Sequence, residues 1–353
     1  MIPLASDTET KPTEKMRQAM AGAAVGDEQK GEDPTVNRLL ERVSDLLGKE
    51  AALFFPGGTM CNLVAIKVHT NPADAVLVDH MAHIIRAESA GAAVGSAVMI
   101  EPIQSVRGVF TAADVEQAIT RVTTLPVPYS PPPRLLCVEQ THNLGGGSVW
   151  KLNELQAVCE FARGRGLATH MDGARLFNAV VASGTTAGDF AECVDSVWVD
   201  FTKGLGAPLG AVLAGSRDFI REARRYKHVF GGALRQAGIV AAGCIYGLDH
   251  HVKRLSEDHA NARRLAQGLS GIDGIAVRNL QPETNMVFFH ALELGLEHNT
   301  FLQALKERGV RMGAVGRLIR AVTHLDVSAE DIETAIKAVA DVARTFNGAT
   351  ISA

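Results

Sequence analysis

The stretch "VDSVWVDFTKGLGAP" (194–208) raises the question on which the fold and function depend, because a lysine follows a run that is typical of a buried strand. Lys203 stands directly after "SVWVDFT" and before a turn with two glycines and a proline. Its ammonium group either extends to solvent or is held in a dry pocket. In a dry pocket, desolvation lowers the pKa of the amine and frees it for Schiff-base chemistry.

The sequence around this stretch alternates between short apolar runs and helical periodicity. Helices are predicted at 34–48, 61–69, 111–121, 152–165, 217–226, 234–267, 299–308 and 329–346. Strands are predicted at 51–55, 75–79, 97–103, 134–140, 167–172, 196–202 and 210–215. Strands that alternate with helices in this way indicate an α/β fold with a mostly parallel central sheet and helices on both faces.

The pattern changes after the long helical stretch. The runs "GIAVRNL", "NMVFFHAL", "VRMGAV" and "LIRAVTHL" alternate with the last two predicted helices, which indicates a smaller α+β domain. We therefore expect a large domain over residues 21–249, a small C-terminal domain over 250–353, and an N-terminal segment, 1–20, that packs near the small domain. A chain of 353 residues has room for two domains.

Composition predicts a cytoplasmic protein. The 35 basic and 39 acidic residues nearly balance, so bulk charge indicates neither a nucleic-acid nor a membrane-surface partner. The N-terminus "MIPLASDTETKPTEKM" has no apolar core of a signal peptide, and no apolar run approaches the ~20 residues of a membrane span. The five cysteines are dispersed without metal-ligand spacing, which indicates reduced thiols, and no metal site is expected.

Two further candidate groups stand at predicted strand ends, where ligands bind in open α/β sheets. In "FPGGTM", Gly58 and Thr59 end a strand and open a helix, whose free N–H groups favour a phosphate. A purely structural turn is the alternative. Asp172 ends the strand "LATHM" and either neutralises a buried cation or caps a helix.

Taken together, the three groups predict a pyridoxal phosphate site. This cofactor requires a lysine for its Schiff base and an acid for its ring nitrogen. Asp172 precedes Lys203 by 31 residues, both at strand ends, and the glycine turn provides a cradle for the phosphate. The protonated ring nitrogen lets the ring accept electrons from a carbanion.

The sequence also resembles the low-specificity L-threonine aldolases, which are fold type I pyridoxal phosphate enzymes of the β-eliminating lyase group. The stretches that carry the resemblance include "VGDEQKGEDPTVNRL", "GKEAALFFPGGTMCNLVAI", "THMDGARLFNAVVA", "FTKGLGAPLGAVLAGS" and "IRAVTHLDVS", and they extend from residue 6 to about 328. The resemblance implies cleavage of a β-hydroxy-α-amino acid to glycine and an aldehyde. It also implies a homo-oligomer, a tetramer or a dimer, with shared active sites.

The resemblance assigns the cofactor site residue by residue. Lys203 matches the Schiff-base lysine, and Asp172 matches the partner of the ring nitrogen. Arg175 matches the arginine that lies along the cofactor and near the substrate. Gly58 and Thr59 match the phosphate cradle.

The resemblance also assigns residues toward the substrate. His83 matches the histidine that stacks on the cofactor ring, and it is a candidate base. His142 is similar to a second histidine near the substrate hydroxyl. Ser6 and Arg320 match groups that hold the substrate carboxylate. Arg235 falls in a segment near the cofactor phosphate, which in this family can belong to a neighbouring subunit. Related enzymes often hold a structural cation.

Three positions depart from the family pattern. Lys30 stands where the family commonly has tyrosine, and Gln140 stands where it has asparagine. Ala87, after Arg86, replaces a frequent aromatic residue. We hypothesise that Lys30 and Arg86 make the substrate side of the pocket more basic and favour a second carboxylate on the substrate. The alternative is that both cations point to solvent.

Three alternatives to threonine cleavage stay open. The first is another reaction of the same cofactor, namely β-elimination, racemisation or transamination. The second is an aldolase specialised for a β-hydroxy diacid. The third is a non-enzymatic scaffold, against which the intact set of Lys203, Asp172 and Arg320 argues.

The assignment of Lys203 is testable by substitution. We expect Lys203→Ala to abolish turnover and the visible absorbance of the lysine-bound cofactor, because no other lysine is placed to form the Schiff base. Absorbance spectra and turnover of the purified variant check this. A variant that keeps both would show that the lysine is wrongly assigned.

Overall fold

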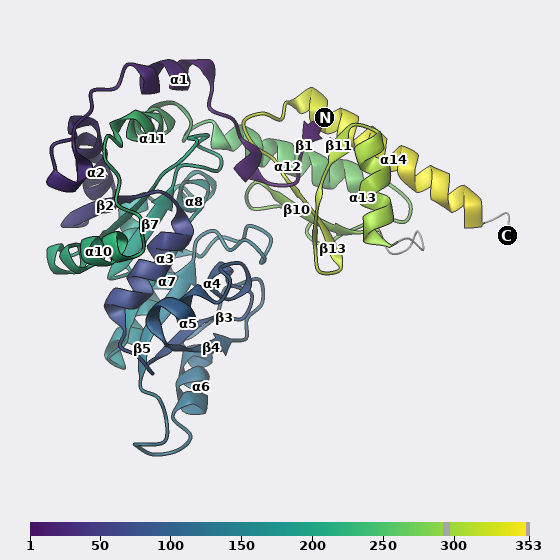
Figure 1. Cartoon of the computed structure of the whole chain (residues 1–353). Helices are drawn as coiled ribbons and strands as arrows, with labels where there is room; N and C mark the ends of the chain where they lie inside the picture. Colours follow the sequence, from purple (N-terminus) through teal and green to yellow (C-terminus); the bar gives the residue numbers. More distant parts are fainter. Residues whose placement is uncertain (292–296, 351–353) are drawn as a thin grey trace.

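The computed structural model describes residues 1–291 and 297–350, and for residues 347–350 only the backbone. The chain forms a large α/β part and a smaller part that contains the C-terminal helix (Figure 1). Residues 292–296 and 351–353 of the predicted small domain lie outside the described residues.

A seven-stranded sheet forms the centre of the large part. Its strand order is β2 (Ala51–Phe55), β8 (Ala211–Gly215), β7 (Ser196–Asp200), β6 (Ala168–Gly173), β5 (Pro133–Glu139), β3 (Ala75–Asp79) and β4 (Met99–Ile103). Strand β8 is antiparallel to both of its neighbours, and the other neighbouring pairs are parallel. The predicted α/β class with a mostly parallel sheet is confirmed.

Helices cover both faces of this sheet. One face packs against α2 (Pro34–Leu47), α6 (Ala112–Val122), α7 (Leu152–Gly164), α8 (Leu176–Ser183), α9 (Ala187–Glu192) and α11 (Gly238–His250). The other packs against α3 (Gly58–His69), α4 (His83–Arg86), α5 (Gly91–Ser96) and α10 (Arg217–Val229).

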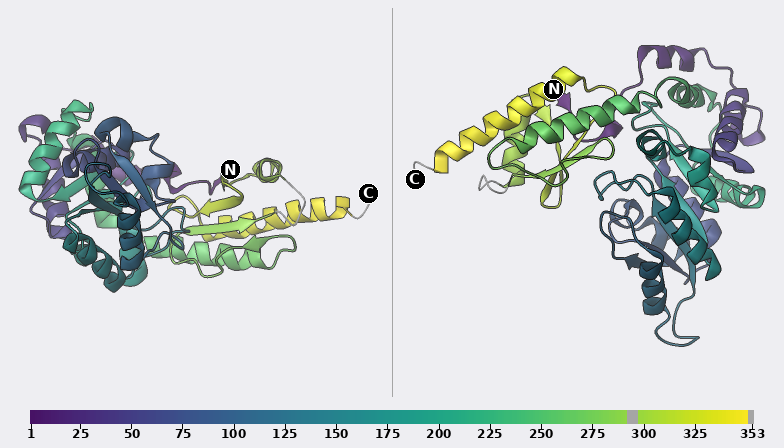
Figure 2. Two further views of the ribbon diagram at one scale, coloured as in Figure 1. Left: turned by 90° about the horizontal axis from the view of Figure 1, so that it is seen from below. Right: turned by 180° about the vertical axis from the view of Figure 1, so that it is seen from behind.

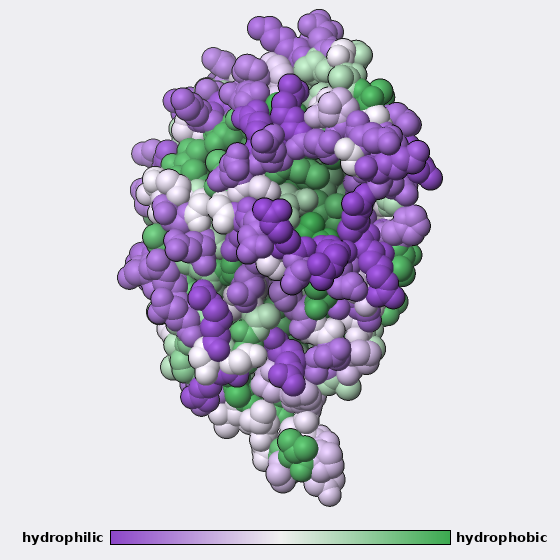
Figure 3. All heavy atoms as spheres, turned by 90° about the vertical axis from the view of Figure 1, so that its left-hand side faces the viewer, coloured by the Kyte–Doolittle hydropathy of each residue, from purple (hydrophilic) through white to green (hydrophobic). Residues whose placement is uncertain are grey.

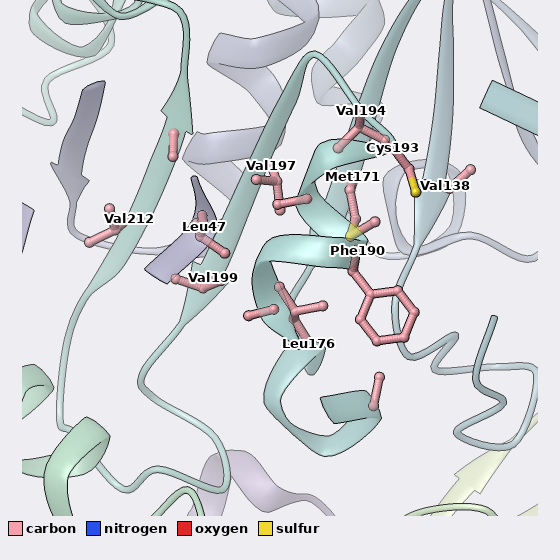
Figure 4. Packing of buried hydrophobic residues seen from close by; sticks show 14 of the residues in the cluster. Leu47, Val138, Met171, Leu176, Phe190, Cys193, Val194, Val197, Val199 and Val212 are labelled. Carbon is pink, nitrogen blue, oxygen red and sulfur yellow. The ribbon is translucent and has the colours of Figure 1, made fainter. Parts of the chain in front are cut away.

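Side chains of β7 alternate between these two faces, as a buried strand requires. Val197 and Val199 pack with Leu176 and Phe190 on the first face (Figure 4). Trp198 points to the opposite face, toward α3. This alternation places one large aromatic ring beside the end of the strand that precedes Lys203.

The smaller part has its own sheet and hydrophobic cluster. The antiparallel sheet has the order β12 (Gly313–Val315), β13 (Leu318–Val322), β10 (Met286–His290) and β9 (Ala276–Val277). Helices α12 (Leu255–Ser270), α13 (His298–Glu307) and α14 (Ala329–Thr350) accompany it (Figure 2). Strand β1 (Ile2–Pro3) pairs in parallel with β11 (Val310–Arg311).

The N-terminal segment contacts both parts. Leu4 belongs to the hydrophobic cluster of the smaller part. Met16, on α1 (Glu14–Ala21), belongs to the core of the large part, where α1 lies beside α11 (Figure 1). The domain boundaries predicted from the sequence stay a proposal, which the two separate hydrophobic clusters support.

The single helix predicted over 234–267 is wrong. Residues 251–254 form turns that separate α11 from α12. Other helix ends agree with their sequence signals. Pro34 stands at the first position of α2, and Gly48 ends it with φ +61°. Ser328 and Asp331 exchange hydrogen bonds at the start of α14.

The surface is largely hydrophilic on the face that Figure 3 presents. The proline-rich loop between α6 and β5 projects from the large part (Figure 1), and Leu125, Val127 and Tyr129 are exposed in it. Among the described residues, no helix combines the length and the apolar character that crossing a membrane requires.

Candidate active site

A cavity of about 540 Å³ lies where the carboxyl ends of β5, β6 and β7 face the N-terminal segment and β13. The residues that line it are Ser6, Thr8, Gly58, Thr59, His83, Arg86, Ala87, Glu139, Asn143, Leu144, Asp172, Ala174, Arg175, Trp198, Asp200, Thr202, Lys203 and Arg320. Most of the predicted site residues are therefore brought together, and His142, Lys30 and Arg235 are not.

Lys203 forms an ion pair with Asp200 on the wall of the cavity. Asp200 also accepts hydrogen bonds from the Thr202 backbone N–H at 3.0 Å and the Thr202 hydroxyl at 2.9 Å. The lysine side chain is largely buried, with 18% of its surface exposed. The amine is therefore held inside the cavity rather than extended to solvent, and Asp200 is a site residue that the sequence analysis missed.

Asp172 lies buried at the floor of the cavity. One oxygen accepts a hydrogen bond from the Ala174 backbone N–H at 3.1 Å, and the other accepts one from Asn62 Nδ2 at 2.8 Å. Burial and the neighbouring Glu139 carboxylate raise the pKa of Asp172 to about 6. A cation beside this carboxylate would stabilise its ionised form and so oppose the effects of burial and of Glu139. A protonated ring nitrogen is such a cation.

His83 is anchored by two glutamates that the sequence analysis did not single out. Its Nδ1 lies 2.9 Å from Glu88 Oε1, and its backbone N–H donates to Glu139 Oε2 at 2.8 Å. The hydrogen bond to Glu88 raises the pKa of His83 above its usual value. Because Nδ1 is engaged, Nε2 is the nitrogen left to act in the cavity.

Arg175 lines the cavity, but its guanidinium is committed to another side chain. Nε and Nη2 each donate to Asp7 at 2.7 Å, and both side chains are buried. Asn285 donates to the same carboxylate at 3.2 Å. The expected place of Arg175, along the cofactor and near the substrate, stays a prediction, and Asp7 takes up the Nε and Nη2 donors of its guanidinium.

Arg320 is the better-placed cation for a carboxylate. It donates through Nη1 to Asn143 Oδ1 at 2.9 Å and through Nη2 to the Ala5 carbonyl at 3.0 Å. Its buried Nε has no hydrogen-bond partner among the described residues. Burial and the nearby Arg175 lower the pKa of Arg320, and a carboxylate bound at this guanidinium would act against both causes. Ser6 lines the same side of the cavity.

The N-terminus of α3 opens onto the cavity at Gly58 and Thr59. Gly58 fits only because it has no side chain, since a Cβ there would lie 2.0 Å from the ring of Trp198. The backbone thus approaches the cavity closely, with the first N–H groups of a twelve-residue helix. Together with Lys203 and Asp172, this cradle fits pyridoxal phosphate.

The structure does not place His142 in this cavity, so its expected place near the substrate hydroxyl stays a prediction. The side chain is fully buried and does not line the cavity. Its Nδ1 accepts a hydrogen bond from the Gly145 N–H at 3.0 Å, and Nε2 lies 3.0 Å from Asp79 Oδ1. Asn143, the next residue, reaches the cavity instead.

Lys30 and Arg235 lie outside the cavity of their own chain. Lys30 is exposed at the end of a short 3-10 helix, Glu28–Lys30. Arg235 is exposed and pairs with Asp27 at 3.1 Å. Both belong to the same neighbourhood, because the Glu28 N–H donates to the Arg235 carbonyl at 3.0 Å.

Comparisons with known proteins agree with this geometry. Residues 3–292 match the beta-eliminating lyase family. The chain is 40% identical over 336 residues to the low specificity L-threonine aldolase of Escherichia coli K12, which covers 94% of this chain and 96% of that protein. Two solved structures share the fold. The Leishmania major threonine aldolase has a TM-score of 0.82 at 21% identity, with 97% and 100% of the two chains covered. A structure of SPT with PLP has a TM-score of 0.75 at 17% identity, with 98% and 88% covered.

The buried pair of Asp7 and Arg175 makes a prediction about stability. We expect Asp7→Asn to lower the free energy of unfolding by about 3–5 kcal/mol, because Arg175 would keep a buried charge without a counter-ion. Urea unfolding at pH 7 measures this. The control is Asp218→Asn, which breaks an exposed pair with Arg221 and should leave stability unchanged.

The same pair predicts a pH dependence. Burial alone would raise the pKa of Asp7, but attraction and hydrogen bonds from Arg175 outweigh burial and hold that pKa below its usual range. Because the folded pKa lies below the unfolded value of about 3.9, the stabilisation is present above that pH and is lost as the pH falls. Asp7→Asn should therefore lose stability less steeply with acid than the wild type. An equal slope in both proteins would contradict this role of Asp7.

Proposed function

The chain belongs to the beta-eliminating lyase family, with a low-specificity L-threonine aldolase as a relative along almost its whole length, and we propose that it is a pyridoxal phosphate-dependent aldolase. Its proposed substrates are β-hydroxy-α-amino acids of the L-threonine and L-allo-threonine type, which it cleaves to glycine and an aldehyde. One observation carries the proposal: a single cavity collects Lys203, Asp172, His83 and Arg320.

Four residues of this chain would hold the cofactor. Lys203 would provide the amine, Asp172 would pair with the ring nitrogen, and Gly58 and Thr59 at the start of α3 would receive the phosphate. When bound, pyridoxal phosphate supplies the electron sink that accepts the electron pair left at Cα when the Cα–Cβ bond breaks. Asp172 contributes by remaining ionised and accepting a hydrogen bond from the ring nitrogen.

Arg320 would orient the substrate by binding its α-carboxylate. Its unpaired Nε and its cationic charge suit the α-carboxylate, and Ser6 adds a hydroxyl nearby. A carboxylate held at this wall would fix the orientation of the other Cα substituents in the cavity, and this orientation would decide which bond of the substrate breaks. Positioning of this kind selects Cα–Cβ cleavage over the loss of another substituent.

Proton transfer is assigned to His83. Glu88 holds Nδ1–H, so the lone pair of Nε2 can take the proton of the β-hydroxyl group, directly or through a water molecule. The proton then resides on a ring whose positive charge Glu88 stabilises. His142 does not line the cavity, and its Nδ1 and Nε2 face Gly145 and Asp79.

We also propose a cellular location and an oligomeric state. The five cysteines are all unpaired, which supports a cytoplasmic location that cell fractionation would test. We also propose a homo-oligomer, a dimer or tetramer, in which Lys30 and Arg235 lie near the cavity of a neighbouring subunit. Light scattering should detect at least a dimer, and a fully active monomer would remove this part of the proposal.

A second candidate function rests on Arg86. This exposed residue lines the cavity beside the small Ala87, and Nε donates to the His80 carbonyl at 2.7 Å. No ion pair of Arg86 occurs in the part of the chain that the structure describes. Its guanidinium could therefore bind a second carboxylate, which favours an aldolase for β-hydroxy diacids.

A panel of substrates decides between these functions. We expect aldehyde and glycine from L-threonine and L-allo-threonine, with no ammonia or oxo acid, and no turnover by Lys203→Ala. Arg320→Gln should raise KM by about 10–100-fold, because a charged hydrogen bond contributes ~1.5–3 kcal/mol. Ammonia and an oxo acid as the main products would instead indicate β-elimination.

The diacid is tested on the same panel with Arg86→Gln. If Arg86 binds a second carboxylate, the variant should lose about tenfold in kcat/KM for a β-hydroxy diacid and little for threonine. An equal effect on both substrates would rule out the second candidate.

A further inference from the structure

A continuous string of buried and partly buried polar side chains leads to Asp172 from the far end of α3. His69 Nε2 lies 2.7 Å from Ser196 Oγ, which lies 2.8 Å from His170 Nδ1. His170 Nε2 lies 3.2 Å from Asn62 Oδ1. Asn62 Nδ2 then reaches Asp172 Oδ2 at 2.8 Å. Each of these groups except Asp172 could in principle point its donor in either direction.

Trp198 removes this freedom. Its indole N–H can only donate, and it donates to Asn62 Oδ1 at 2.7 Å. The oxygen end of the Asn62 amide must therefore face Trp198, and the NH₂ end must face the carboxylates. Nδ2 lies 2.8 Å from both Asp172 Oδ2 and Glu88 Oε1, so its two N–H groups serve two acids at once.

The hydrogen-bond directions at His170, Ser196 and His69 follow from the orientation of Asn62. Because Asn62 Oδ1 is an acceptor, His170 must carry its proton on Nε2, and Nδ1 must then accept from the Ser196 hydroxyl. Ser196 Oγ in turn accepts from His69. Burial lowers the pKa of His170 to about 3 and that of His69 to about 4, so both imidazoles are neutral.

We propose that Trp198 is a positioning residue whose indole N–H sets the direction of this hydrogen-bond string and so keeps an N–H donor on the Asp172 carboxylate. The charged groups around Asp172 make this donor necessary. Glu139, Glu88 and His83 all face it, and two of the three are acids that disfavour its ionised form. The donor from Asn62 favours the ionised form that a protonated ring nitrogen requires.

The alternative is that Trp198 only fills space. Its ring does pack against Gly58 and lies 5.7 Å from Lys203 Nζ. A space-filling role needs the ring but not the N–H, and Trp198→Phe separates the two because phenylalanine keeps an aromatic face without a donor. In this variant Asn62 Oδ1 loses its indole donor, so the amide is held only by His170 and the two carboxylates, and its donation to Asp172 is weakened.

The chain offers a matched control in its other tryptophan. Trp150 is fully buried, and its Nε1 has no hydrogen-bond partner among the described residues. Its ring meets Phe110 edge-on at 4.9 Å between centroids. Trp150→Phe therefore makes the same change in side-chain size inside the core. It removes an indole N–H that has no hydrogen-bond partner among the described residues.

The first measurement is a pH titration of the visible absorbance of the holoenzyme. In Trp198→Phe the midpoint should move upward by about one pH unit, because weaker protonation of the ring nitrogen raises the pKa of the lysine-bound group. The value of kcat should fall about tenfold with little change in KM. Trp150→Phe should leave the midpoint unchanged. An equal midpoint in the wild type and Trp198→Phe, or an equal shift in both variants, would overturn the proposal.

The second measurement does not need the cofactor. In the wild-type apoprotein labelled with ¹⁵N-histidine, His170 should be the neutral Nε2–H form, with its signals assigned by their loss in His170→Gln. A Nδ1–H or doubly protonated ring would overturn the proposal. The prediction for the absorbance of the holoenzyme rests on the proposed function. If His170 is in the neutral Nε2–H form but the protein cleaves no β-hydroxy amino acid, only the proposed function is refuted.

Discussion

The burial of the Asp172 carboxylate is the constraint on which the rest of the site depends. A charge in this position is costly unless donors or a cation surround it. The Ala174 N–H and Asn62 provide the donors, and the ring nitrogen of the proposed cofactor would provide the cation. Glu139 and Glu88 work against the charge and raise the pKa of Asp172. A cationic ligand at the floor of the cavity would stabilise the ionised form of Asp172 against these causes.

The parallel sheet explains why these groups meet. In the register of the strands, Asp172 lies opposite Glu139 on one side and Trp198 on the other. Strands β5, β6 and β7 thus deliver two acids and the aromatic ring to one edge. Gly173 permits the close packing of β6 on β7, since a Cβ there would lie 2.2 Å from the Trp198 carbonyl oxygen.

The opposite wall comes from segments that are distant in the sequence. Arg320 lies on β13 of the smaller part and binds the Ala5 carbonyl, while Asp7 binds Arg175 of the large part. The N-terminal segment therefore joins the two parts at the cavity. A relative movement of the two parts would change the spacing between Arg320 and the floor of the site, where the substrate would bind.

The sequence by itself determined the local features. Strands at 51–55 and 75–79 agree with β2 and β3, because short apolar runs bounded by turn residues describe buried strands well. It also determined which residues to examine at the strand ends, and Lys203, Asp172 and Gly58 do line one cavity. The break between α11 and α12 was not predictable, since no glycine or proline occurs between Gly247 and Gly268. Only the tertiary structure decided that Asp7 takes up Arg175, that His142 is buried, and that Trp198 orients Asn62. Periodicity and turn signals are properties of neighbouring residues, whereas each of these contacts joins side chains that only the folded chain brings together.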